Sequence, residues 1–197
     1  SAQIDIELGR LESAGRALDR AAELAPEEAE IDYLRGVIAQ RWEKFDAALA
    51  SYAEAYRKRP EDLAYLLAQA EMLVTLGREQ DALVLLLDRS TYFEHSAAIR
   101  DAIGQLYEHR GEFDKAVDAY RQASVLDSED DTVRERLAVA LYRADRHREA
   151  MAQLARLLAK DAYTGRTDLL LMLGETRMTL GMSIEARESF DEVTRLE

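Results

Sequence analysis

The side chains that could catalyse a reaction or hold a metal ion are few and poorly spaced. The three histidines, His95, His109 and His147, lie far apart, and none belongs to an HExxH-type spacing of the kind that binds zinc. The chain has no cysteine, which excludes a thiolate nucleophile, a cysteine-ligated zinc site and a disulfide. It also has no glycine-rich phosphate loop and no GxSxG sequence. We therefore expect no enzyme activity, no cofactor and no metal site.

Carboxylates are abundant, but they follow no catalytic pattern. Asp and Glu number 39 in 197 residues, and the formal net charge is −13. A run such as Asp127–Asp131 is typical of a solvated turn whose acids favour the N-terminus of the next helix. Because proteins bind nucleic acids through basic faces that release counterions, we expect no nucleic-acid partner. The longest apolar run, Ala82–Leu87, is far shorter than the roughly 20 residues that span a bilayer, so we expect no membrane span.

The elements that position these side chains follow a repeat of 34 residues along the whole chain. A small residue recurs at Ala2, Gly36, Ala70, Gly104, Ala138 and Gly174, with a last step of 36 residues. Twelve residues after each small residue comes an alanine: Ala14, Ala48, Ala82, Ala116, Ala150 and Ala186. Four residues after each alanine comes a large apolar residue: Leu18, Tyr52, Leu86, Tyr120, Leu154 and Phe190. This order predicts paired helices that cross closely at the small residues, with the other two series packed between them.

The segment 97–130 carries the pattern most completely, with Gly104, Tyr107, Gly111, Ala116 and Tyr120 in order. This order and spacing resemble the tetratricopeptide repeat (TPR), a helix–turn–helix unit of 34 residues. The resemblance covers essentially the whole chain. It implies an all-α fold, a right-handed α-solenoid of stacked antiparallel helix pairs known as the TPR superhelix.

The repeats divide the chain into twelve predicted helices, of which the first is partial. Turns are expected at Gly9, Gly77, Gly111, Asp145 and Gly181, and the longer last step places two extra residues near 163–166. The predicted array is a single domain, 1–197. Its repeats are the partial unit 1–28 and the units 29–62, 63–96, 97–130, 131–164 and 167–197.

The two ends of the array raise a further expectation. The chain begins part-way through a repeat, and the last repeat has no polar capping helix to cover Val193 and Leu196. We therefore expect that the chain is a fragment of a longer protein that continues in both directions, or that it pairs end to end with a second copy.

The link 88–96 departs from the pattern, because Arg89 stands where a small or apolar residue is usual. The sequence predicts that the second helix of this repeat stops early and that Tyr92 and Phe93 lie in an irregular link. Two interpretations are open. The aromatic side chains fill the gap left by the shortened helix, or the link widens the array locally for use by a partner.

The resemblance to the TPR family also implies where a partner would bind. In that family the first helices of successive repeats line a concave groove, which holds an extended or helical segment of a partner protein. Residues spaced i, i+4 and i+7 on the first helices predict the groove residues, a stripe that extends to Met178. They are Tyr33, Val37, Leu67, Glu71, Asp101, Gln105, Glu108, Glu135, Arg136, Val139, Tyr142, Leu171 and Glu175.

The predicted groove is acidic in its middle and apolar at its ends. Glu71, Asp101, Glu108 and Glu135 outweigh Arg136, which predicts a partner segment that is basic and carries a few large apolar side chains. The alternative is that these acids only solubilise the surface. Arg136 is the only residue that fits the pattern of TPR proteins that hold a C-terminal carboxylate, so that subclass is not expected.

Three functions remain open from the sequence. We favour an adaptor that binds a peptide or helical segment of a partner. The second possibility is a structural or assembly subunit, and the third is an accessory TPR region of a larger, catalytic protein.

Overall fold

The computed structural model describes residues 2–196, and within that range it contains twelve α-helices, one 3₁₀ turn and no strand. The all-α fold and the number of helices predicted from the repeat are confirmed. Ser1 and Glu197, the ends of the predicted array 1–197, lie outside the described residues. The chain divides into two compact units, residues 1–93 and 94–197. The expectation of one continuous array across both units stays a prediction.

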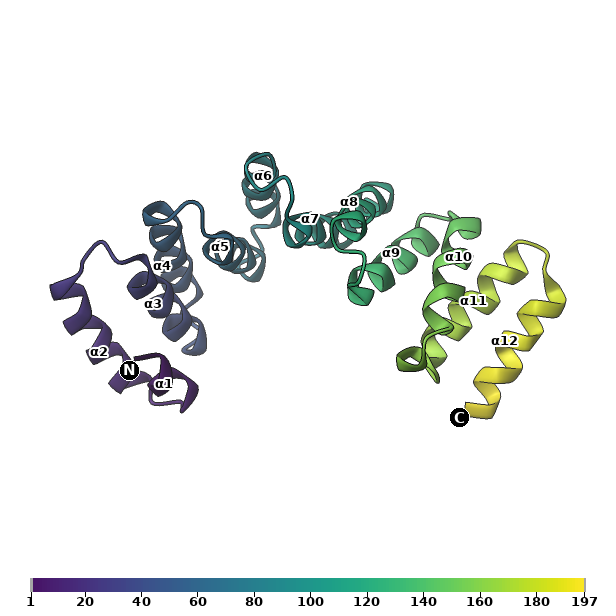
Figure 1. Ribbon diagram of the computed structural model, residues 1–197, viewed down its shortest axis with the longest axis horizontal. Coiled ribbons are helices and arrows are strands. Elements are labelled where there is room, and N and C mark those ends of the chain that lie inside the picture. The colour runs from purple at the N-terminus through teal and green to yellow at the C-terminus, as the bar shows by residue number, and fades with distance from the viewer. Residues whose placement is uncertain (1, 197) are drawn as a thin grey trace. The chain divides into compact units, whose positions relative to one another are not determined.

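The first unit contains three helix pairs. In each pair a short turn brings the second helix back along the first, so that α3 packs on α4 and α5 on α6, and α4 also packs on α5 (Figure 1). The helices are α1 (Ala2–Glu7), α2 (Leu11–Leu24), α3 (Ala29–Arg41), α4 (Phe45–Lys58), α5 (Leu63–Thr75) and α6 (Glu79–Arg89).

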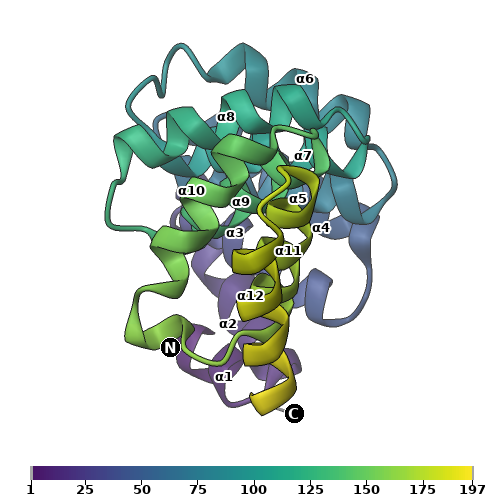
Figure 2. The ribbon, with the colours of Figure 1, turned by 90° about the vertical axis from the view of Figure 1, so that its right-hand side faces the viewer.

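The second unit has the same design. Here α7 packs on α8, α9 on both α8 and α10, and α11 lies alongside α12 (Figure 2). The elements are α7 (Ala97–His109), α8 (Phe113–Leu126), α9 (Asp131–Arg143), α10 (His147–Leu158), the 3₁₀ turn η1 (Asp161–Tyr163), α11 (Thr167–Thr179) and α12 (Ser183–Leu196).

The predicted packing series form the core of both units. All six alanines of the repeat series are 0% exposed. Gly104 on α7 lies against the ring of Tyr120 on α8 so closely that a Cβ atom there would stand 2.6 Å from two ring carbons. A Cβ on Gly36 or Gly174 would meet the ring of Tyr52 or Phe190 equally closely. The three glycines are therefore required by close helix crossings, as the repeat predicts.

One turn geometry joins the two helices of a pair. After α7, Gly111 has a φ of +71°, its N–H donates to the carbonyl of Glu108 at 2.9 Å, and the N–H of Glu112 donates to the carbonyl of Tyr107 at 2.9 Å. This pair of bonds is the Schellman motif, which satisfies the last carbonyls of a helix and needs a left-handed residue. The predicted turn at Asp145 has the same geometry with a φ of +57°.

The turn between α3 and α4 places Glu43 in the left-handed region, with a φ of +57°. A left-handed conformation costs a residue with a Cβ roughly 1–2 kcal/mol, whereas glycine adopts it freely. We expect Glu43→Gly to raise the free energy of unfolding by about 1 kcal/mol. Urea unfolding measures this, and Glu43→Ala, which removes the charge but keeps the Cβ, should give little of the gain. Equal gains from the two variants would show that charge is responsible.

The end of the first unit answers part of the question raised by the link 88–96. Helix α6 ends at Arg89, as predicted, and the guanidinium of Arg89 lies over the ring of Tyr56 on α4, 5.8 Å from its centroid. The rings of Tyr92 and Phe93 meet edge to face at 4.8 Å, and Tyr92 is exposed. Arg89 therefore packs on an aromatic ring of the preceding repeat where a small residue is usual. A use of the link by a partner stays a prediction.

The two extra residues of the last step lie between α10 and α11. There the chain forms η1, whose Tyr163 is buried together with Leu154, Leu157 and Leu169. Beyond it, Arg166 donates to Glu135 on α9 at 2.6 Å and to Asp168 at 2.8 Å. The hydrogen bonds to Arg166 hold the pKa of Asp168 below its usual value. The insertion therefore adds both a core tyrosine and an arginine that ties α9 to the start of α11.

Candidate functional site

The predicted groove residues of the second unit lie together on the first helices of its pairs. We call the side presented by α7, α9 and α11 the first-helix face of this unit. Asp101, Gln105 and Glu108 come from α7, and Glu135, Arg136, Val139 and Tyr142 from α9, with Leu171 and Glu175 on α11. Contacts join the three helices, since Arg136 donates to Asp101 at 2.5 Å and the Tyr142 hydroxyl donates to Glu175. The i, i+4, i+7 spacing thus brings these residues together.

The acids of this face are tied to arginines of the next repeat. Glu108 accepts from Arg143 at 2.8 Å and from the hydroxyl of Tyr120 at 2.8 Å. Glu135 accepts from Arg166 at 2.6 Å. The acidic surface is therefore partly neutralised within the chain, and its charges are held in fixed positions.

Asp101 is the most enclosed of these acids, with a side chain 15% exposed. Its Oδ2 accepts from Arg136 at 2.5 Å and from Gln105 at 2.8 Å, while its Oδ1 is buried without a hydrogen-bond partner among residues 2–196. Burial is the largest single influence on the pKa of Arg136 and would lower it, but the hydrogen bond to Asp101 and the attraction of its charge together raise the pKa. Asp101 is thus held by its neighbours, and Arg136 is its main charge partner.

The sequence showed Asp101, Glu108 and Glu135 but not their partners Arg143 and Arg166. A signal for two of the pairs exists in the numbering: Arg136 and Arg143 each follow their acid by 35 residues. One repeat plus one residue places a side chain on the neighbouring first helix, so opposite charges at that separation predict an ion pair between repeats.

The first unit carries Tyr33, Val37, Leu67 and Glu71 of the predicted groove. The ring of Tyr33 lies 5.5 Å from that of Tyr52 and 5.0 Å from that of Tyr65. Val37 and Leu67 are half-buried, and Glu71 is exposed. This unit therefore presents an aromatic cluster with few free charges.

Hydrogen bonds fix the tyrosine cluster of the first unit. The Tyr65 hydroxyl donates to Glu30 at 2.9 Å, and the Tyr52 hydroxyl donates to Gln40 at 2.7 Å. Burial, together with the hydrogen bond to Glu30, raises the pKa of Tyr65 to about 12. Both hydroxyls are therefore neutral donors at ordinary pH, used inside the unit.

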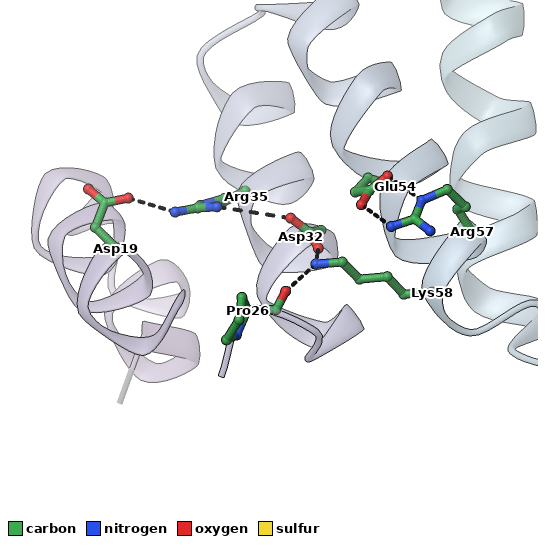
Figure 3. A network of polar contacts seen from close by, with 7 residues as sticks. All are labelled: Asp19, Pro26, Asp32, Arg35, Glu54, Arg57 and Lys58. Atoms are coloured by element: carbon green, nitrogen blue, oxygen red, sulfur yellow. Dashed lines mark hydrogen bonds and ion pairs between the residues drawn. The ribbon is translucent and has the colours of Figure 1, made fainter. Parts of the chain in front are cut away.

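A network of polar contacts joins α2, α3 and α4 in the first unit (Figure 3). Lys58 on α4 donates to Asp32 on α3 at 2.5 Å and to the carbonyl of Pro26 at 2.5 Å. Arg35 on α3 donates to Asp19 on α2 at 2.9 Å. The lysine and Asp32 are both nearly buried, so the network ties the first repeat to the second through polar groups that are satisfied.

Two of the three histidines lie close to a single neighbouring carboxylate each. His95 lies 3.3 Å from the neighbouring Glu94, and His147 lies 3.7 Å from Asp145. Among residues 2–196 no three acidic or histidine side chains come together in a way that could hold a metal ion. No helix in the same range is long and apolar enough to cross a membrane.

Comparison with known proteins gives a family and a fold. A family model described as tetratricopeptide repeat matches residues 39–93 and 102–165. No curated protein sequence matches the chain. A crystal structure of MamA is 19% identical, with a TM-score of 0.75, and the match covers 87% of this chain and 93% of MamA.

Two further structures are similar to the chain. YrrB, described as a TPR protein with an unusual peptide-binding site, is 17% identical with a TM-score of 0.76, covering 92% of each chain. A tetratricopeptide repeat protein from Parabacteroides merdae is 17% identical with a TM-score of 0.75, covering 100% of this chain and 77% of that one. At these identities the likeness concerns the fold.

Proposed function

The chain belongs to the tetratricopeptide repeat family, whose fold is a protein-interaction scaffold, and from this premise we propose that it binds a peptide or helical segment of a partner protein on its first-helix faces. The observation that carries the proposal is the exposed apolar surface of α11. Leu171 is 40% exposed and Met178 is 53% exposed on one stripe of this helix, with Glu175 between them. Neighbouring exposed apolar side chains can form part of a patch that a partner covers, and these two lie one above the other on the predicted groove stripe.

The contacts on this face also suggest different roles in binding for its acidic and its apolar residues. Because Asp101, Glu108 and Glu135 are held by arginines, they need little reorganisation when a partner approaches. The apolar residues supply burial, for which Met178 is well suited since methionine adapts to different partners. We therefore expect the partner segment to be anchored by apolar side chains and steered by its basic ones. The peptide-binding site of YrrB, a protein of similar fold, is consistent with a peptide ligand.

The proposal is tested with a fluorescein-labelled amphipathic helical peptide of leucine and lysine, titrated with the full chain in fluorescence anisotropy. We expect saturable binding that the double variant Leu171→Asp/Met178→Asp weakens at least about tenfold, because two anchoring side chains become charged. The on-rate should fall as salt rises, since exposed charges are screened beyond about 10 Å at 0.1 M.

The matched control is Ile184→Asp on α12. Ile184 is 77% exposed and, as a residue of a second helix, lies off the stripe of α11, so the control adds one negative charge at an exposed apolar residue, as each single change of the double variant does. It should change the affinity less than about twofold. Equal weakening by the control and the double variant, or the absence of saturable binding to wild type, would overturn the proposal.

A further inference from the structure

A separate groove of about 490 Å³ lies between α8, α9 and α10 in the second unit, and we call it the α8/α9/α10 groove. Its wall includes Arg121 and Ser124 of α8, Arg134 of α9, Gln153 and Arg156 of α10, and Lys160 just beyond α10. None of these residues belongs to the first-helix face. In a chain with a net charge of −13, a groove with four cations in its wall stands out.

The acids near this groove are too few to neutralise its cations. One acid, Glu129, is part of the wall. Asp131 serves two cations at once, since Lys160 donates to both its oxygens at 2.5 and 2.7 Å and Arg134 forms a second ion pair with it. The pairing with Lys160 holds the pKa of Asp131 below its usual value, so it stays ionised at neutral pH. The single negative charge of Asp131 therefore balances only one of the two positive charges on Lys160 and Arg134.

The same sharing occurs on the opposite wall. Glu149 accepts from Arg121 at 2.8 Å and from Arg146 at 2.8 Å. Arg156 is exposed and forms no ion pair or hydrogen bond within the described part of the chain. Gln153 adds an amide group to the wall, whereas the Ser124 hydroxyl donates to the carbonyl of Arg121 at 2.9 Å. The groove thus keeps an excess of positive charge.

The equivalent groove between α4, α5 and α6 has an acidic wall instead. That groove encloses about 750 Å³ and lies two repeats of 34 residues earlier. Ala53 takes the place of Arg121, and Asp88 takes the place of Arg156. Its wall also contains Asp46 and Asp81. The repeat architecture therefore supplies the hollow, and substitutions at equivalent positions change its charge from acidic to basic.

The equivalent groove between α2, α3 and α4 has acids as well as cations in its wall, namely Glu12 and Asp19 with Arg16, Arg35 and Lys44. Asp19 stands there at the position of Arg121, and it accepts from Arg35 in the groove wall at 2.9 Å (Figure 3). One cation in that groove is therefore matched by an acid of the facing helix. In the α8/α9/α10 groove the residue at the position of Asp19 is Arg121, which adds a cation in place of an acid.

We propose that the α8/α9/α10 groove binds an acidic segment of a partner protein, whose carboxylates pair with Arg156 and with the shared cations Arg121 and Lys160. The cations come from separate helices around a cavity of about 490 Å³, an arrangement that suits several carboxylates along a segment better than one compact anion. The net negative charge of the chain repels an acidic segment over most of its surface. The positively charged groove therefore determines where such a segment binds. This site is independent of the first-helix faces, because its charged residues lie on or beside second helices or on the outer side of α9.

The test uses a fluorescein-labelled decaglutamate peptide, titrated with the full chain at low ionic strength and followed by fluorescence anisotropy. We expect saturable binding that weakens as salt rises. Arg156→Glu should weaken it at least about tenfold, because the variant both removes a donor and adds a repelling charge. Circular dichroism checks that the variant keeps its helix content, which is expected since Arg156 is exposed.

The matched control is Arg148→Glu, an exposed arginine of the same helix that lies outside the groove wall. It changes the net charge of the chain equally and should alter the affinity less than about twofold. Equal weakening by both variants would show binding to overall charge and overturn the proposal. So would displacement of the peptide by low millimolar inorganic phosphate, or binding only to anionic phospholipid vesicles, because the ligand would then be a phosphate group or a membrane. The double variant of Leu171 and Met178 should bind decaglutamate as wild type does.

Discussion

Replacing Gly104 by alanine is expected to lower the free energy of unfolding by about 2 kcal/mol. The new methyl carbon would stand 2.6 Å from the ring of Tyr120, which is fully buried and cannot move aside without disturbing its hydrogen bond to Glu108. Overpacking of this kind typically costs 1–3 kcal/mol. Urea unfolding measures the loss, and hydrogen exchange should show that α3 and α4, two repeats away, keep their protection because a repeat depends on its neighbours.

The residue pairs at the other helix crossings indicate which second substitution should compensate for Gly104→Ala. Where the small residue is glycine its partner is aromatic, as in Gly104 with Tyr120, and where it is alanine its partner is leucine, as in Ala138 with Leu154. Adding Tyr120→Leu to Gly104→Ala should therefore recover stability relative to the sum of the two single changes, with a coupling of about 1–2 kcal/mol.

The matched control for this cycle is Gly15→Ala in α2. A Cβ at Gly15 meets nothing within 4 Å, so alanine should stabilise the helix by about 1 kcal/mol through its higher helix propensity. Additive effects of the Gly104 and Tyr120 changes would show that the close approach does not limit this position.

Removing the positive charge of Arg136 should also be costly. In Arg136→Met, the nearly buried Asp101 keeps only Gln105 as a hydrogen-bond partner. Breaking a buried pair typically costs 3–5 kcal/mol, and because Arg136 is 37% exposed we expect a loss of about 2 kcal/mol. Urea unfolding measures this loss at neutral pH.

The double variant Asp101→Leu/Arg136→Met leaves no unpaired charge, so it should be more stable than Arg136→Met alone. As a control, Arg187→Met removes an arginine that is 83% exposed and 3.7 Å from Asp191, and it should change stability by less than about 0.5 kcal/mol. If the single and double variants were equally destabilised, the cost would come from lost packing by the Arg136 side chain.

The repeat in the sequence was sufficient to predict the helices and their close crossings. Three residue series at one spacing define which sides of two helices meet, and steric limits then decide the residue types, as Gly104 and Ala116 show. The left-handed turn at Glu43 was not predicted, because glutamate as a residue type gives no local sign of that conformation. Its place in the repeat, equivalent to Gly77 and Gly111, was the available signal.

The sequence predicted where the residues of the candidate site lie, but not which ion pairs neutralise its acids. Helical spacing placed Asp101 and Glu108 on one face, yet it could not tell which arginine of the next repeat reaches back to them. The α8/α9/α10 groove was missed for a related reason. Arg121, Arg156 and Lys160 are scattered along the chain, and only the packing of three helices gathers them around one hollow.

The pairing of small and large residues at the helix crossings bears on how such a gene can be rearranged. Both partners of each crossing, such as Gly104 and Tyr120, are encoded within one repeat, so exchanging whole repeats by recombination keeps every crossing intact. A breakpoint between them that joined repeats of different type would set an alanine against a tyrosine, which clashes, or a glycine against a leucine, which leaves a void. Crossovers between repeats of different type are therefore expected to lie outside the stretch from the small residue to its large partner, so that each crossing is inherited as a pair.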